Sequence, residues 1–135
     1  MAAIQWTDEL SVKIPSIDNQ HKRLINLINQ LDASIENGNA NIVINGTLKE
    51  LTRYTEAHFI YEEALFTMHG YPESDSHKIA HQKLFGKVEY FKEKIKENDE
   101  EIYGELLEFL NNWLYHHILK EDMSYSPYLV ECGAE

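Results

Sequence analysis

The chain has few of the residues that mark several large classes of protein. It holds one cysteine, Cys132, which excludes an intramolecular disulfide framework and any CxxC zinc or redox motif. Three prolines and six glycines lie mostly between apolar-periodic segments, which favours helices over strands and turns. No apolar run approaches the roughly 20 residues of a membrane-spanning helix. The catalytic patterns HExxH, GxSxG and the P-loop are absent from the sequence.

Positive charge is also scarce. Lys and Arg number 12 against 23 Asp and Glu, which gives a formal net charge of −11. Because affinity for phosphate groups comes largely from Lys and Arg, neither nucleic acid nor an anionic membrane surface is an expected partner. The stretch from Met1 to Leu10 lacks a basic region followed by an apolar one. No secretory signal is therefore expected, and the cytoplasm is the predicted location.

Length and hydrophobic periodicity predict one all-α domain over residues 1–135. Apolar residues recur at helical spacing in four segments, at about 17–35, 42–68, 76–95 and 101–122. Short polar or Gly/Pro-containing stretches separate the segments, at 36–41, 69–75 and 96–100, and Gly38 is the expected C-cap of the first. Four similar helices with short connections predict an antiparallel, up-down-up-down four-helix bundle. A non-helical N-terminal arm (1–16) and a short tail (123–135) flank it.

Five of the seven histidines fall at one height in this bundle, together with two carboxylates. Residues equidistant from a turn lie level in antiparallel helices, because both helices rise by ~1.5 Å per residue. Counting outward from the three turns brings seven residues into one layer near one end of the bundle: His21, His58, Glu62, His77, His81, His117 and Asp122. Within this layer, His58/Glu62 and His77/His81 have i, i+4 spacing, so each pair projects from one helix face.

This layer predicts a metal site, whereas solvated histidines in a metal-free bundle are the alternative. Seven side chains exceed the four to six ligands of one ion, so two ions bridged by the carboxylates fit better. Nitrogen and oxygen donors suit iron, zinc, manganese or copper, and spacing does not choose among them. Asp122 is the irregular member, since it lies about 140° around a regular helix from His117. Spacing alone pairs His117 with Glu121; Asp122 requires a local irregularity or a carboxylate that reaches back.

The chain resembles the bacterial members of the hemerythrin family over nearly its whole length. The matching stretches are 17–21, 58–63 and 70–72, then His77 and His81, and finally 113–118 with Asp122. Trp6 also fits the N-terminal arm of that family. The combination HxxxE, HxxxH and HxxxxD, in this order, is highly specific, and it favours Asp122 over Glu121.

The resemblance implies a non-haem centre of two iron ions with an oxo or hydroxo bridge. It implies that His77, His81 and His117 hold one iron, and that His21 and His58 hold the other. Glu62 and Asp122 are then the bridging carboxylates, and the two-histidine iron keeps an open position for O2.

Reversible O2 binding for transport or storage is therefore the expected function. An O2-sensing or redox-sensing module is the alternative, which the lack of a visible output domain disfavours. The histidine-rich ligand set also points away from the carboxylate-rich di-iron enzymes, so no enzymatic activity is expected. Nothing in the sequence demands a subunit interface, so a monomer is compatible with it, and a redox or O2-consuming protein is the candidate partner.

Apolar residues within a turn of the predicted ligands are candidate walls of an O2 pocket. They are Leu114, Ile118, Phe59, Leu24 and Ile25. Leu114 precedes His117 by three residues on nearly the same helix face, which makes it the candidate for controlling access.

Other chemically notable residues are expected to lie outside the site. His69 falls in the second turn, where a solvated loop histidine is expected, and His116 points about 100° away from His117. Glu63 and Glu121 adjoin predicted ligands and are expected to face solvent. Cys132 lies in the predicted tail and is expected to be a free thiol without function.

Overall fold

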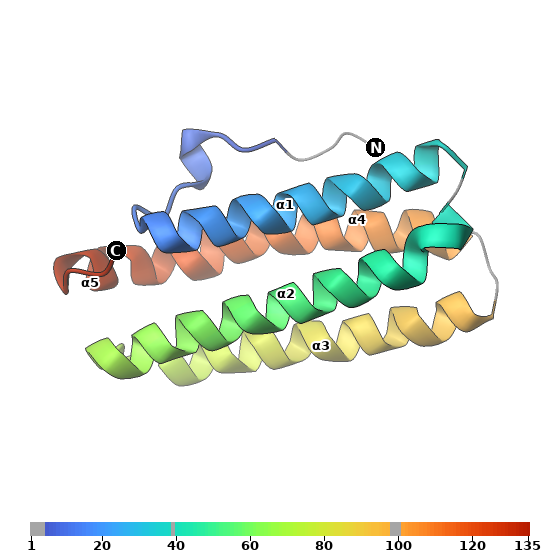
Figure 1. Cartoon of the computed structure of the whole chain (residues 1–135). Coiled ribbons are helices and arrows are strands. Elements are labelled where there is room, and N and C mark those ends of the chain that lie inside the picture. Colours follow the sequence, from blue (N-terminus) through green and yellow to red (C-terminus); the bar gives the residue numbers. More distant parts are fainter. Residues whose placement is uncertain (1–4, 39, 98–100) are drawn as a thin grey trace.

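The computed structural model describes residues 5–38, 40–97 and 101–135. Four long helices run side by side and antiparallel in chain order (Figure 1): α1 (Pro15–Glu36), α2 (Ala40–His69), α3 (Ser74–Lys96) and α4 (Glu101–His116). α1 packs against α2 and α4, and α3 packs against the same two helices. This arrangement confirms the predicted all-α four-helix bundle. None of the helices described is long and apolar enough to cross a membrane.

The helix ends follow from proline and glycine. α1 begins at Pro15, ahead of the predicted start, because proline fits the first position of a helix, where no N–H partner is needed. Gly38 and Gly70 follow the ends of α1 and α2 with φ values of +74° and +64°, a left-handed conformation that favours glycine. Residues 39 and 98–100 of the predicted first and third turns lie outside the described residues.

The helix at the end of the bundle does not stop at residue 122. After α4, the chain forms a π-helical turn, η2 (His117–Asp122), and then α5 (Met123–Glu131). Residues 123–131 of the short tail predicted after the fourth segment are therefore helical. Tyr125 and Leu129 explain the helix, since both side chains are fully buried in an apolar cluster and this burial stabilises the helical conformation. Cys132, just beyond α5, is an exposed free thiol.

Residues 5–14 of the N-terminal arm lie along α1 (Figure 1) and include a short 3-10 turn, η1 (Asp8–Leu10). Asp18 of α1 holds the arm, because its carboxylate accepts hydrogen bonds from Ser11 Oγ at 2.6 Å and from the Val12 N–H at 2.9 Å. The side chains of Val12 and Ile14 are thereby buried at the end of the bundle that also receives α5.

Two apolar clusters lie on either side of the predicted metal layer. The larger one fills the bundle with side chains from α1 to α4 and includes Phe59. The smaller one gathers Phe66 and Tyr125 with the arm and the α2–α3 turn. α5 also ties down that turn, since the Tyr128 hydroxyl donates to the His69 carbonyl at 2.6 Å. His69 is thus the partly buried last residue of α2 rather than a loop residue.

Candidate metal centre

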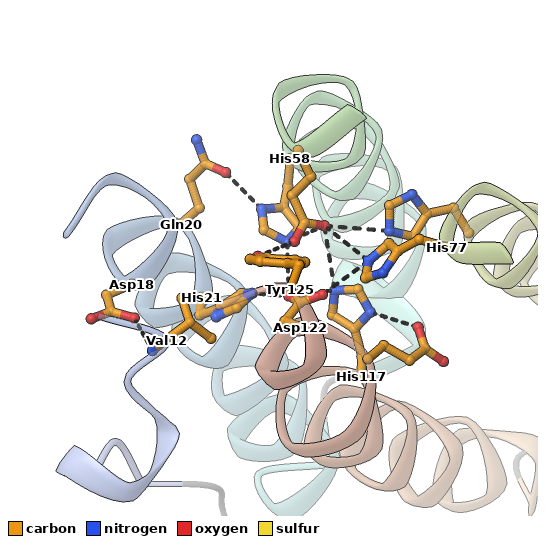
Figure 2. A network of polar contacts seen from close by, with 12 residues as sticks. Val12, Asp18, Gln20, His21, His58, His77, His117, Asp122 and Tyr125 are labelled. Atoms are coloured by element: carbon orange, nitrogen blue, oxygen red, sulfur yellow. Dashed lines mark hydrogen bonds and ion pairs between the residues drawn. The ribbon is translucent and has the colours of Figure 1, made fainter. Parts of the chain in front are cut away.

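All seven residues of the predicted layer meet in the interior of the bundle. Figure 2 shows His21, His58, His77, His117 and Asp122 pointing toward one another. The seven residues come from α1, α2, α3 and η2, and each side chain is buried. Their potential ligand atoms form two overlapping groups, each within 4.8 Å: His21, His58, Glu62, His117 and Asp122 in one, and His77, His81 and His117 in the other. His116, in contrast, is exposed.

The π turn brings Asp122 to the same centre as His117. Five residues separate the two positions, and a π-helical turn, with its i to i+5 repeat, places such residues on one face. The Asp122 Oδ2 atom lies 3.0 Å from His117 Nε2. The local irregularity that spacing required for Asp122 is therefore present. Glu121, the alternative partner, lies on the outer side of the His117 ring, 3.2 Å from Nδ1.

The two carboxylates occupy the middle of the cluster. Glu62 Oε1 lies 3.2 Å from His58 Nε2 and 3.3 Å from His81 Nε2, so it faces imidazoles of α2 and α3 at once. Asp122 faces α1 and α3, with Oδ2 at 2.7 Å from His21 Nε2 and Oδ1 at 3.0 Å from His77 Nε2. Each carboxylate thus lies between side chains of both ligand groups.

The inward-facing atoms have no hydrogen-bond partner among the described residues. They are the Nε2 atoms of His58, His77, His81 and His117, together with Glu62 Oε1 and Asp122 Oδ1. Buried polar atoms almost always have a partner, and leaving one without costs about 1–3 kcal/mol. Six such atoms converging on one small volume fit a metal cation, which accepts lone pairs where a hydrogen-bond donor is missing.

The protonation states suit metal binding. Burial lowers the pKa of His58 to about 3, against the opposing effect of Glu62. Burial and Asp122 act to raise the pKa of Glu62, but His58, His117 and His81 outweigh them and lower it to about 2. His58 is therefore neutral and Glu62 ionised at neutral pH, as ligands must be. Burial acts to lower the pKa of His117, but the nearby carboxylates of Asp122, Glu121 and Glu62 outweigh it and raise that pKa, so a metal ion would displace a proton there.

Three residues outside the cluster contact the Nδ1 atoms of ligand histidines, on the side of each ring that faces away from the centre. Gln20 Oε1 lies 2.6 Å from His58 Nδ1, and Glu63 Oε2 lies 3.3 Å from His81 Nδ1. Glu121 holds His117 in the same way. The expectation that Glu63 and Glu121 face solvent is therefore wrong for their carboxylates. Both side chains are only partly exposed, because each lies beside a ligand-bearing helix turn and reaches the nearest imidazole N–H.

Tyr125 reaches the cluster from α5. Its hydroxyl donates a hydrogen bond to Glu62 Oε2, and its ring contacts His77 with a centroid separation of 5.5 Å. Burial, Asp122 and Glu62 raise the pKa of Tyr125 well above its usual value, so the hydroxyl stays protonated and remains a donor. Sequence reasoning missed this residue, although its i+3 spacing from Asp122 is a signal that could have found it.

Aromatic rings pack against the outer faces of the imidazoles. The Phe59 ring stacks on His81 with centroids 3.6 Å apart, and Trp113 stacks on His117 at 5.0 Å. Trp113 precedes His117 by four residues, a spacing that could have predicted the contact. The five residues predicted to line an O2 pocket (Leu114, Ile118, Phe59, Leu24 and Ile25) are all buried in the larger apolar cluster. Their role as pocket walls stays a prediction.

A helical bundle in which α1, α2, α3 and η2 direct five imidazoles and two carboxylates into one buried layer is typical of metal-binding bundles. The sequence model of one protein family, the hemerythrin HHE cation binding domain, matches residues 12–129 of this chain. The chain belongs to the hemerythrin family. It is 35% identical over 125 residues to the bacteriohemerythrin of Pseudomonas aeruginosa, which covers 93% of this chain and 80% of that protein.

A second relative and a solved structure agree with this membership. The bacteriohemerythrin of Clostridium acetobutylicum is 33% identical over 124 residues, covering 89% of this chain and 96% of the relative. A crystal structure of wild-type hemerythrin superposes with a TM-score of 0.82 at 29% identity, covering 95% of this chain and 98% of that one.

Proposed function

We propose that this protein holds two non-haem iron ions in the buried layer and uses them to bind O2 reversibly. The observation that carries the proposal is the convergence of six atoms without hydrogen-bond partners, namely four imidazole nitrogens and one oxygen of each carboxylate. Donors of this kind, without thiolate, suit iron. Family membership supports the choice of iron and of O2, since the matching domain is a cation-binding domain of hemerythrins.

We assign His77, His81 and His117 to one iron, and His21 and His58 to the other, with Glu62 and Asp122 bridging. The first three histidines form one of the two ligand groups, which supports this division. His117 also lies within reach of the second group, and its outer contact with Glu121 orients the ring.

Bound iron would supply the electrons that O2 needs in order to bind, and the protein controls its surroundings. Glu62 and Asp122 offset part of the metal charge in a place where burial makes charge costly. Gln20, Glu63 and Glu121 fix the rings so that each Nε2 points inward. The apolar clusters on both sides exclude water, and Tyr125 keeps Glu62 in place through its hydroxyl.

The first test is the visible absorption spectrum of the purified protein with measured iron content. The protein is reduced without air, then exposed to air, and finally flushed with inert gas. We expect two iron ions per chain and a colour that appears with air and fades on flushing. A stable oxidised spectrum that flushing does not reverse would contradict reversible binding, and the lack of any metal-dependent band would contradict the iron site.

Transport or storage is the use that we propose for this O2 binding, with no catalysed reaction and with a cytoplasmic location. The burial of all seven ligand side chains supports retention of a ligand over turnover. The sensing alternative requires the bundle to change with the state of the metal. Amide hydrogen exchange of the reduced and oxidised forms tests it: widespread differences in α5 or the arm would favour sensing, whereas unchanged protection there would favour a carrier.

A further inference from the structure

The outer partners of the ligand histidines differ in charge. In the group of His77, His81 and His117, two rings are held by carboxylates, those of Glu63 and Glu121. In the pair of His21 and His58, the single outer partner among the described residues is the neutral amide of Gln20, and the buried Nδ1 atom of His21 has none. The polar surroundings of the centre are therefore unequal on its two sides.

This difference changes how strongly each imidazole donates to a metal. An amide oxygen and a carboxylate both accept a hydrogen bond from Nδ1–H, so both leave the Nε2 lone pair facing inward. A carboxylate, however, is an anion, and it pulls the proton outward and makes the ring a stronger ligand. Partners of this kind typically change metal affinity by about 10–100-fold.

Each outer partner also stands next to a ligand in the chain. Gln20 precedes His21 on α1 and holds a ring of α2, whereas Glu63 follows Glu62 on α2 and holds a ring of α3. The neighbouring ligand fixes the backbone position of residue 20. Glutamate has nearly the same shape as glutamine, so Gln20→Glu changes the amide to a carboxylate without a change in size. The charge at this place is therefore a variable that can be altered separately from the geometry.

We propose that the charges of Gln20, Glu63 and Glu121 make the two metal sites unequal, so that the site of His77, His81 and His117 keeps its ion more tightly. Gln20 is the positioning residue that keeps the site of His21 and His58 the weaker one. This inference rests on the proposed two-ion centre. The inference concerns the equilibrium affinity for each ion and not the rate of its release. A cleft of about 560 Å³ borders His77 and Glu121, and such access to solvent affects the release rate separately from the affinity.

The test is an equilibrium competition on the ferrous protein without air. Samples loaded with two iron ions are equilibrated with rising concentrations of the ferrous chelator ferrozine, and the iron remaining per chain is measured. The wild-type protein is expected to lose its ions in two separate steps. Three isosteric variants are compared with it: Gln20→Glu, Glu63→Gln and, as a matched control on the exposed face of α2, Glu56→Gln.

Gln20→Glu is expected to shift the weaker step to about 10-fold more chelator and to leave the tighter step in place. Glu63→Gln is expected to shift the tighter step to about 10-fold less chelator, and Glu56→Gln to shift neither. General structural damage would weaken binding in every variant and could not tighten one step. Urea denaturation of each apoprotein checks that all variants are folded.

The inference would be overturned if the wild-type protein lost both ions in a single step, or if Gln20→Glu left the weaker step at the same chelator concentration. In either case two bound iron ions would still agree with the proposed function. Equal weakening of both steps by Glu63→Gln would also overturn the inference. A wild-type protein that takes up no iron at all would refute the proposed function, and this inference with it.

Discussion

Removal of one hydroxyl at the centre tests how much α5 contributes to the site. In Tyr125→Phe the ring stays, so its packing against Phe66 and His77 is kept. The hydrogen bond to Glu62 Oε2 is lost, and that oxygen is left buried without its donor, since both side chains are fully buried. Leaving a buried acceptor without a partner costs about 1–3 kcal/mol, and a charged acceptor falls toward the upper end. We therefore expect the apoprotein to lose about 2–3 kcal/mol of unfolding free energy.

The assay is urea denaturation of the apoprotein followed by far-UV circular dichroism. A change in the midpoint with a constant m-value would identify a loss of stability in the folded state. Two tyrosines serve as controls. Tyr128→Phe removes a hydrogen bond to the His69 carbonyl and should cost about 0.5–1.5 kcal/mol. Tyr90→Phe alters an exposed side chain and should stay within about 0.5 kcal/mol of the wild type.

The ordering of the three variants carries the test. If Tyr125→Phe were as stable as Tyr90→Phe, the hydroxyl would contribute nothing, and the view that α5 supports Glu62 would be refuted. The same measurement on the iron-loaded protein adds a second comparison. In the proposed centre Glu62 would hold metal ions, which would replace the lost donor, so the cost of Tyr125→Phe is expected to be smaller in the loaded form.

Three further predictions concern the ligands, the apolar wall and the turns. Because Asp122 faces both ligand groups, Asp122→Ala should lower the bound iron from two ions per chain to one or fewer. Elemental analysis measures this content, and the control Glu56→Ala should leave it unchanged. Leu114→Ala should speed the irreversible loss of the O2-dependent colour, since it opens space in the wall; an unchanged rate would contradict its gating role. Gly70→Ala should cost about 1–2 kcal/mol in urea denaturation because φ is +64°, while Gly86→Ala, in a helix with nothing near the added methyl group, should stabilise by about 0.5–1 kcal/mol.

The bundle and the convergence of its polar residues could be predicted because both depend on regular geometry. Helical periodicity and short turns place His21 level with His58, and the i, i+4 spacing of His77 and His81 puts both rings on one face. These rules need no knowledge of side-chain contacts. They hold wherever helices are regular, which explains why α1 to α3 match the predicted segments apart from a few residues at their ends.

The features that escaped prediction depend on contacts between elements. Gln20 has no spacing signal that links it to His58, since the two side chains meet only when α1 packs on α2. Glu63 and Glu121 looked like solvent-facing neighbours of ligands because charged residues usually are. The sequence predicts no further helix over α5, because the burial of Tyr125 and Leu129 arises from long-range contacts with the arm that the local pattern does not reveal.

The departures from regular structure gather at one place in the molecule. Helices rarely contain a π turn, yet η2 carries two residues of the centre, His117 and Asp122. Buried carboxylates and unpartnered nitrogens are also rare, and they meet at the same layer. Each feature lowers the stability of the metal-free chain, and the apolar clusters on both sides of the layer offset that loss. Such local violations persist when a ligand satisfies them, so their coincidence in space supports a functional centre more strongly than any one of them does alone.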